Sequence, residues 1–100
     1  MKKTKKVIKT KSAQELAEAL NLDASVAVEW ELRYQITERI ITKFNEGEHT
    51  VAALARRTET SRARITNILK RETIGISLDV LSRVLGALGQ TVIIKFFDAA

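Results

Sequence analysis

Basic and polar side chains gather between residues 56 and 71, where six Lys and Arg residues stand against one acid. A local excess of cations on this scale is the electrostatic pattern of a surface that binds phosphate groups. Arg62 and Arg64 lie within this stretch, and an arginine that forks onto guanine is the commonest specific contact between a protein and a DNA base. The predicted base contacts are therefore Arg62 and Arg64, with Thr66 and Asn67 binding either bases or phosphates.

A second group of residues is expected to hold phosphates and so to set the position of the protein along DNA. Two of them begin predicted helices, where free backbone amides and the helix dipole attract anions. The other two act through charge. These residues are Thr50 and Ser61 at the helix N-termini, and Lys70 and Arg71 at the end of the basic stretch.

Two short helices joined by a tight turn would hold these side chains in position. Residues 50–69 are suited to form such a pair of helices. Thr50 and Ser61 are residue types that cap a helix N-terminus. The first helix is expected to be very short, and the second is predicted over residues 61–71. Apolar residues recur where each helix faces the other, and the small Ala55 allows the two axes to cross closely. The expected packing residues are Leu54, Ala55, Ile65 and Ile68.

Three more helices are predicted around this pair, and they make the chain mainly α. Ser12 opens a capping box before a short apolar stretch, so a first helix is expected over residues 12–20. A second is expected over residues 25–46, because apolar residues recur every four positions and a glycine follows. Ser77 begins a fifth helix, with leucines at spacings of three and four, and Gly89 ends it. The residues expected in the core from the second helix are Trp30, Leu32, Ile36, Ile40, Ile41 and Phe44.

Residues 91–97 change to the pattern of a β-strand, rich in β-branched and aromatic side chains. A single strand cannot satisfy its own backbone. The strand is therefore expected to pair with its copy in a second subunit or with another protein. The alternative is that it folds back on its own domain. Both faces of the strand are apolar, with Val92, Ile94 and Phe96 on one and Ile93 and Phe97 on the other.

Charge and composition divide the chain into three segments. Residues 1–11 hold six Lys and no acid, whereas the whole chain carries a net charge of +5. This basic tail is predicted to be disordered in the free chain; its composition fits either a solvated tail or an arm that follows the DNA backbone or minor groove. Residues 12–89 form the predicted helix-turn-helix domain, with its motif at 50–69. Residues 90–100 carry the strand and are expected to mediate dimerisation.

The order of these elements resembles the Xre, or lambda-repressor-like, family of helix-turn-helix regulators over residues 22–89. The family has a small Ala in the first helix of the motif, a Ser capping the second, a branched residue four positions later and a following S-L-x-x-L helix. The sequence departs from this pattern at Glu59, where a turn glycine is usual and a positive φ is often needed, and at Val51, where a phosphate-binding Gln is usual. The matching residues are Ala55, Ser61, Ile65 and Ser77-Leu78-Asp79-Val80-Leu81.

The resemblance implies a compact five-helix lambda-repressor-like DNA-binding domain, which the C-terminal β-strand extends. It also implies a sequence-specific DNA-binding transcriptional regulator, a repressor that reads the major groove with helix 61–71. We expect a homodimer on a palindromic operator of double-stranded DNA, with half-sites about 34 Å apart.

A second interpretation comes from the small size of the chain. Small basic domains of this family that have a short extension at each end and no ligand domain resemble antitoxins of the HigA type. That resemblance implies a type II toxin–antitoxin pair, in which the protein neutralises a ribonuclease toxin and represses its own operon. A plain repressor uses the same DNA-binding residues, so the gene next to this one would distinguish the two functions.

Composition argues against other classes of protein. The chain has no Cys and a single His, His49, so neither a thiolate site nor a His-rich metal site is expected, and no cofactor is implied. It has no glycine-rich phosphate loop and no nucleophile elbow, and Glu46 with Glu48 fits a polar loop, so we expect neither an enzyme nor catalytic residues. No segment has the length of a membrane span or the apolar core of a signal peptide, which favours a cytoplasmic protein without membrane contact.

Overall fold

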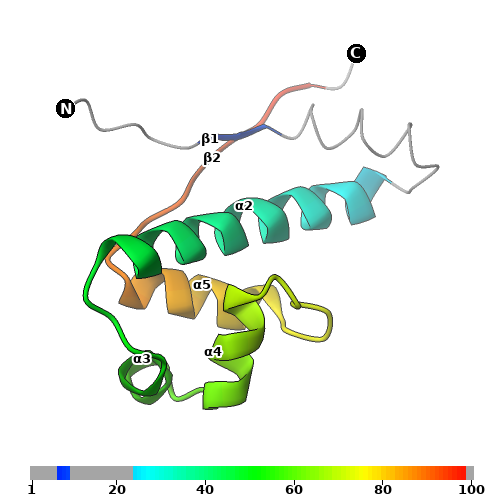
Figure 1. Cartoon of the computed structure of the whole chain (residues 1–100). Coiled ribbons are helices and arrows are strands. Elements are labelled where there is room, and N and C mark those ends of the chain that lie inside the picture. Colours follow the sequence, from blue (N-terminus) through cyan, green and yellow to red (C-terminus); the bar gives the residue numbers. More distant parts are fainter. Residues whose placement is uncertain (1–6, 10–23, 99–100) are drawn as a thin grey trace. The chain divides into compact units, whose positions relative to one another are not determined.

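Helix α2 is the longest element of the fold and runs from Ala24 to Glu46 in the computed structural model, which describes residues 7–9 and 24–98 (Figure 1). It confirms the helix predicted over residues 25–46. The helix predicted at 12–20 lies outside the described residues, and so does the basic tail apart from residues 7–9.

Three shorter helices follow α2, and each begins at the capping residue predicted for it. Helix α3 is Val51–Thr58, α4 is Arg62–Leu69 and α5 is Leu78–Ala87. In each case the hydroxyl oxygen of the residue before the helix accepts a hydrogen bond from the backbone N–H three residues further on, at 3.1 or 3.2 Å. This bond satisfies one of the amides that a helix N-terminus leaves free. The described part of the chain is thus mainly α, with four helices, a short C-terminal strand and a second short strand near the N-terminus.

The same three helices also end in the same way, each at a residue with a left-handed backbone. These residues are Glu59 (φ 54°), Arg71 (φ 65°) and Gly89 (φ 79°). The backbone N–H of the residue after each one donates to a carbonyl five positions earlier, at 2.9, 2.8 and 3.3 Å respectively, which is the Schellman pattern. Gly89 confirms the predicted end of α5. Helix α4 stops at Leu69, earlier than predicted, because Arg71 takes the left-handed conformation.

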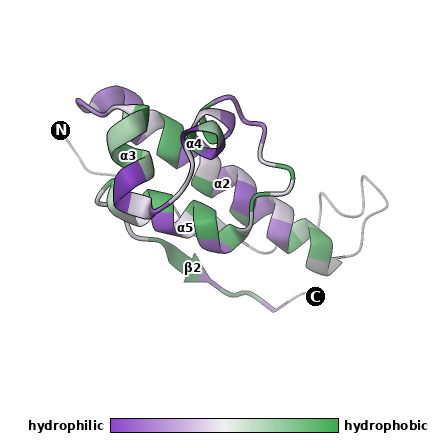
Figure 2. Ribbon diagram, turned by 90° about the horizontal axis from the view of Figure 1, so that it is seen from below, coloured by the Kyte–Doolittle hydropathy of each residue, from purple (hydrophilic) through white to green (hydrophobic). Residues whose placement is uncertain are grey.

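The chain divides into two compact units. We call residues 35–91 the helical unit, and residues 1–34 with 92–100 the strand unit; α2 contributes residues to both. In the helical unit, α3 packs against both α4 and α5. In Figure 2, α3 changes from hydrophobic to hydrophilic along its length, whereas α5 is largely hydrophobic. The buried core of this unit consists of Ile36, Ile40, Leu54, Ala55, Ile65, Ile68, Ile76, Leu81, Val84 and Leu85.

Trp30 was expected in the core, and the structure shows that this prediction was wrong. Its side chain is 49% exposed, whereas Ile36 and Ile40 are 5% and 0% exposed. The reason is helical geometry, because positions six and ten residues apart do not return to one face of a helix with 3.6 residues per turn. Trp30 belongs instead to a separate stripe with a spacing of four residues, together with Val26 and Tyr34, which are 41% and 61% exposed.

The strand unit contains a parallel pair of short strands. Strand β1 is Val7–Lys9 and strand β2 is Ile93–Lys95, in the register Val7 to Ile93, Ile8 to Ile94 and Lys9 to Lys95. Strand β2 is therefore shorter than the predicted span 91–97, and it pairs within its own chain, which was the alternative to pairing with another subunit. The partner comes from three residues of the segment that had been expected to be disordered.

Candidate nucleic-acid interface

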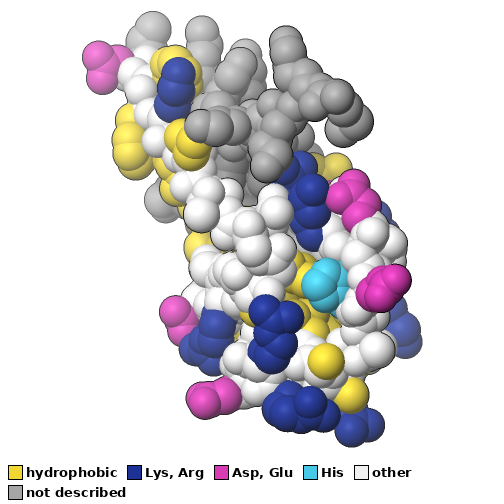
Figure 3. All heavy atoms as spheres, turned by 90° about the vertical axis from the view of Figure 1, so that its left-hand side faces the viewer, with side chains coloured by type: hydrophobic (Ala, Val, Ile, Leu, Met, Phe, Trp, Pro, Cys, Tyr) yellow, Lys and Arg dark blue, Asp and Glu magenta, His cyan; other side chains and the backbone are white. Residues whose placement is uncertain are grey.

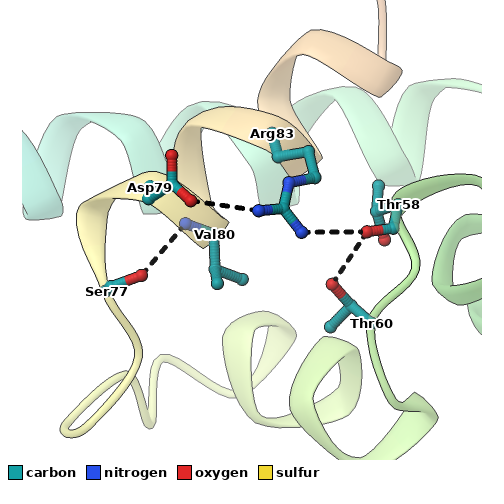
Figure 4. A network of polar contacts seen from close by, with 6 residues as sticks. All are labelled: Thr58, Thr60, Ser77, Asp79, Val80 and Arg83. Atoms are coloured by element: carbon teal, nitrogen blue, oxygen red, sulfur yellow. Dashed lines mark hydrogen bonds and ion pairs between the residues drawn. The ribbon is translucent and has the colours of Figure 1, made fainter.

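The turn between α3 and α4 is held by hydrogen bonds that converge on the carbonyl oxygen of Thr58 (Figure 4). The hydroxyl of Thr60 donates to this oxygen at 3.2 Å, and Nη1 of Arg83 donates to it at 3.3 Å. Arg83 belongs to α5, and its Nη2 forms an ion pair with Oδ2 of Asp79 at 3.0 Å. The hydroxyl of Thr58 is buried and donates to the carbonyl oxygen of Leu54 at 2.7 Å. These bonds tie the turn to α5 and so fix the position at which α4 begins.

The turn also contains a strained backbone conformation at Glu59, the position where the sequence has no turn glycine. Glu59 has a φ of 54°, in the left-handed region that side chains with a Cβ adopt at a cost. Its N–H donates to the carbonyl oxygen of Arg56 at 3.3 Å, and the N–H of Thr60 donates to that of Ala55 at 2.9 Å. The hydrogen-bonded turn thus forms without a glycine. The free-energy cost is that of the left-handed backbone conformation of Glu59.

The variant Glu59→Gly is expected to be more stable than the natural protein. Removing the Cβ relieves about 1 kcal/mol of strain, part of which is offset by the greater freedom of glycine in the unfolded chain. Urea unfolding followed by circular dichroism measures the change. Glu48→Gly is the matched control, because Glu48 also lies in an exposed turn but has no positive φ, and it should not be stabilised. A lower unfolding midpoint for Glu59→Gly than for the natural protein would contradict this account.

Helix α4 has one buried and one exposed face. Ile65 and Ile68 are 1% and 0% exposed and belong to the core of the helical unit. Arg62 and Arg64 lie in the first turn of the helix, and both side chains are exposed. The two predicted base-contacting arginines therefore point away from the protein interior. Of the other predicted contacts, Thr50, Ser61, Asn67, Lys70 and Arg71 are exposed and Thr66 is half-buried.

Most cations of the helical unit are bound by other groups of the protein. Arg57 donates from Nη2 to the carbonyl oxygen of Ala87 at the end of α5, at 2.7 Å, and Lys43 pairs with Glu46 at 3.0 Å. Four cations of the motif differ, because among the described residues no acid and no hydrogen-bond acceptor binds their charged groups. They are Arg56, Arg62, Arg64 and Lys70.

Unpaired cations close together in sequence create a positive potential that attracts a polyanion. Figure 3 shows Lys and Arg side chains, in dark blue, projecting at the lower end of the face in view, which is the level of α3 and α4 in Figure 1. The charge of Arg56, Arg62, Arg64 and Lys70 is available to a ligand because no internal ion pair has to be broken first.

Arg71 was predicted to bind phosphate through its charge, and the structure gives that charge a partner on α2. Its Nε donates to Oε2 of Glu38 at 2.6 Å, and its Nη2 donates to Oε1 at 2.9 Å. This is the two-pronged geometry in which an arginine binds a carboxylate most strongly. Because Arg71 also has the left-handed backbone that ends α4, the pair attaches the C-terminal end of α4 to α2. In the structure, Arg71 holds α4 in position.

The pair also makes stability depend on pH. The hydrogen bonds from Arg71 hold the pKa of Glu38 below its usual value of 4.5. A carboxylate with a lowered pKa stabilises the folded state at pH values above its unfolded pKa, and the contribution is lost as the pH falls through the folded pKa. The side chains are 30% and 59% exposed, so the pair contributes roughly 0.5–1 kcal/mol.

Glu38→Gln is therefore expected to lower the free energy of unfolding at pH 7, with the difference from the natural protein vanishing in acid below the folded pKa. Urea unfolding at a series of pH values measures both effects. Glu46→Gln is the matched control, since Glu46 binds Lys43 in an exposed pair that does not connect two helices. Equal loss of stability by Glu38→Gln at all pH values would show that the charge of Glu38 is not responsible.

Sequence reasoning missed the residues that position the motif. Glu38 and Arg71 are 33 positions apart, and Arg39 donates to Oε1 of Gln90 across 51 positions at 3.1 Å. No local sequence pattern predicts pairs that are so far apart in the chain. Only Arg83 carried a signal, because it lies four residues after Asp79, the spacing of an ion pair on one helix face.

Nothing in residues 7–9 and 24–98 suggests a metal centre, since no group of three or more His, Cys, Asp or Glu side chains is close enough to hold an ion there. The single histidine, His49, lies near Phe44, with ring centroids 5.9 Å apart. No helix in these ranges is long and apolar enough to cross a membrane. The comparisons with known proteins add no family: no family model, curated protein or solved structure matches the chain significantly.

Proposed function

We propose that this protein binds double-stranded DNA in a sequence-specific manner and acts as a transcriptional repressor. Helices α3 and α4 form the helix-turn-helix unit, and α4 enters the major groove. The single observation that carries the proposal is that Arg62 and Arg64, in the first turn of a capped helix, are both exposed and have no partner among the described residues. In helix-turn-helix proteins the N-terminal residues of the second helix contact the base edges.

The dimensions of α4 fit this role. Its eight residues make a rod about 12 Å long, similar to the width of the major groove of about 12 Å. Its inner face is anchored by Ile65 and Ile68, its beginning by the turn bonds to Arg83, and its end by the Arg71–Glu38 pair. A helix that is held at both ends can present its two arginines to DNA at fixed positions.

Phosphate contacts complete the proposed interface. Thr50 and Ser61 cap α3 and α4, and the remaining free amides at these two N-termini favour an anion. Lys70 follows α4 with an exposed, unpaired ammonium group. Arg56, near the end of α3, is a fourth candidate that the sequence analysis did not include among the contacts. Thr66 and Asn67 remain candidates for base or phosphate contacts.

Neutralisation of a toxin is the second candidate function. The observation in its favour is that the strand unit exposes large apolar residues that belong to neither α3 nor α4, so a protein partner and DNA could use different residues. In this function the same helix-turn-helix unit represses the operon that encodes both proteins. Copurification with the product of an adjacent gene, and loss of that protein's ribonuclease activity in the complex, would identify the antitoxin.

The test of DNA binding is fluorescence anisotropy with duplexes from the upstream intergenic region and with unrelated duplexes, over a series of salt concentrations. We expect tighter binding to one intergenic duplex, and an affinity that falls steeply with salt because counterions are released from DNA. Lys70→Ala is expected to weaken binding to all duplexes alike and to reduce the salt slope by about 1.

Lys43→Ala is the matched control for Lys70→Ala, because it removes the same charge from α2, where Lys43 is paired with Glu46. It should leave both affinity and salt slope close to those of the natural protein. Equal effects of the two variants would mean that only net charge matters. Binding to no duplex at low salt would end the proposal.

A further inference from the structure

Ile74 projects from the surface of the helical unit, and its side chain is 100% exposed. The other large apolar side chains of residues 35–91 are buried or half-buried. A single exposed apolar residue is ordinary on a protein surface. Ile74 differs because the backbone holds it rigidly, in the loop 70–77 that joins α4 to α5.

A tight turn presents Ile74 at the tip of this loop. The backbone N–H of Ile76 donates to the carbonyl oxygen of Thr73 at 3.0 Å, and Gly75, the third residue of the turn, has a φ of 85°. This is the pattern of a type II turn, in which glycine supplies the positive φ. The side chain of Ile74 is also branched at Cβ, which leaves it few rotamers. A ligand that contacts Ile74 therefore has little conformational freedom to remove.

Both sides of the turn are fixed to the rest of the helical unit. Before it, the N–H of Glu72 donates to the carbonyl oxygen of Asn67 in α4 at 2.8 Å, and Arg71 binds Glu38 of α2. After it, Ile76 is only 6% exposed and belongs to the core. The turn therefore keeps a constant position relative to α4.

The loop begins where α4 would leave the major groove. With Arg62 and Arg64 at the base edges, the opposite end of α4 lies towards the rim of the groove, along which a sugar-phosphate strand runs. Lys70, the proposed phosphate contact, follows that end. Figure 2 shows α4 nearly along its axis, with the loop directly beside it. In the proposed complex Ile74 therefore faces the backbone of DNA and not its bases.

The chemistry of the loop favours an apolar contact. Residues 72–76 contain no cation and one acid, Glu72, so they offer phosphate no ionic partner. The apolar groups of the DNA backbone are the C–H groups of its deoxyribose rings, whereas thymine methyl groups lie inside the major groove. A fully exposed isoleucine on a rigid turn matches the sugars.

We propose that Ile74 is a DNA-contacting residue, which packs against deoxyribose at the rim of the groove. The inference rests on the proposed DNA binding and adds to it a contact that depends on neither salt nor base sequence. Such a contact increases affinity without increasing the number of counterions released. It also fixes α4 against one strand of the duplex, as other backbone contacts do.

Ile74→Ala is expected to weaken binding to the preferred and the unrelated duplex alike, by about 5- to 10-fold, because alanine loses most of the apolar contact. The salt slope should stay that of the natural protein. Lys70→Ala, four residues earlier, should instead reduce the slope, so anisotropy over a salt series separates the two kinds of contact. Because Ile74 has no buried surface, urea unfolding of Ile74→Ala should give the natural midpoint.

Ile74→Val and Ile74→Thr form a matched pair. Valine and threonine have nearly the same shape, but threonine replaces a methyl group by a hydroxyl. We expect Ile74→Val to bind DNA more tightly than Ile74→Thr at every salt concentration. Val26→Ala is the control for loss of an exposed aliphatic group, since Val26 is 41% exposed and lies in the strand unit. It should bind DNA as the natural protein does.

A duplex in which deoxyuridine replaces every thymine distinguishes sugar from base. Deoxyuridine keeps the deoxyribose and lacks the methyl group that thymine places in the major groove. The loss caused by Ile74→Ala should therefore be the same in this duplex as in the thymine duplex. A loss that disappears with deoxyuridine would assign the contact to a base methyl group and overturn the proposal.

Two further results would overturn it. Ile74→Ala could bind within twofold of the natural protein while Lys70→Ala binds more weakly, in which case Ile74 would not touch DNA although the proposed function stands. A reduced salt slope for Ile74→Ala would show that its effect passes through ionic contacts. Absence of binding by the natural protein to any duplex is a separate outcome, which removes the proposed function itself and this inference with it.

Discussion

Replacement of both Arg62 and Arg64 by alanine is expected to abolish sequence preference while general DNA binding persists. Each arginine that forks onto guanine discriminates against a wrong base by about 1–3 kcal/mol, so the double variant should lose on the order of 100-fold or more in the ratio of specific to nonspecific affinity. Neither side chain has a partner among the described residues, and alanine favours a helix, so α4 should keep its structure. Anisotropy with the preferred duplex and an unrelated duplex measures the ratio.

The double variant Arg62→Lys with Arg64→Lys separates base recognition from charge. Lysine keeps the cation but cannot form the two-pronged contact, so this variant should retain the nonspecific affinity and still lose preference. Retained preference in the alanine variant would show that other residues select the sequence. Loss of helical signal by circular dichroism would show that the two arginines serve the fold, contrary to their exposure.

The largest expected effect on stability comes from Ala55→Phe. Ala55 is 5% exposed in the core of the helical unit, on the helix that packs against both α4 and α5. A phenyl ring at this position has no space in a close-packed core, and overpacking costs about 1–3 kcal/mol, with larger values where neighbours cannot move. Because α3 has core neighbours on two helices, we expect a loss of about 3 kcal/mol or more, enough to unfold a marginal domain.

Ala63→Phe is the matched control for this change. Ala63 lies in α4 with an exposed side chain, so the same substitution there should alter the free energy of unfolding by less than about 0.5 kcal/mol. Urea unfolding followed by circular dichroism compares the two variants with the natural protein. If Ala55→Phe were as stable as Ala63→Phe, α3 would not pack closely against α4 and α5. The position that the structure gives to α4 would then be wrong as well.

The beginnings of the helices were predictable because capping is a local interaction. Thr50, Ser61 and Ser77 each accept a hydrogen bond from an amide three residues on, so the residue type at one position and the apolar pattern after it carry the whole signal. The exposure of Arg62 and Arg64 followed from helical periodicity in the same way. The end of α4 was predicted two residues too late, because the basic run continues through Arg71 although its backbone turns left-handed.

Trp30 illustrates a different kind of failure. Its residue type favours burial, and it was counted with the apolar stripe of α2 although its spacing from Ile36 and Ile40 does not match one helix face. Periodicity was the more reliable signal here, and residue type the weaker one. For β2, the apolar pattern predicted a strand, but it did not predict the pairing of that strand with β1.

By itself the sequence determined the mainly α character of the chain, the four described helices to within one or two residues at their ends, and the residues that face outward from α4. The physical reason is that capping, helical periodicity and turn conformation depend on neighbours within a few positions. Tertiary structure alone decided the pairing of Arg71 with Glu38, the bond of Arg83 to the turn and the pairing of β1 with β2. These contacts join residues 25 to 86 positions apart, and only the packing of the folded chain brings such residues together.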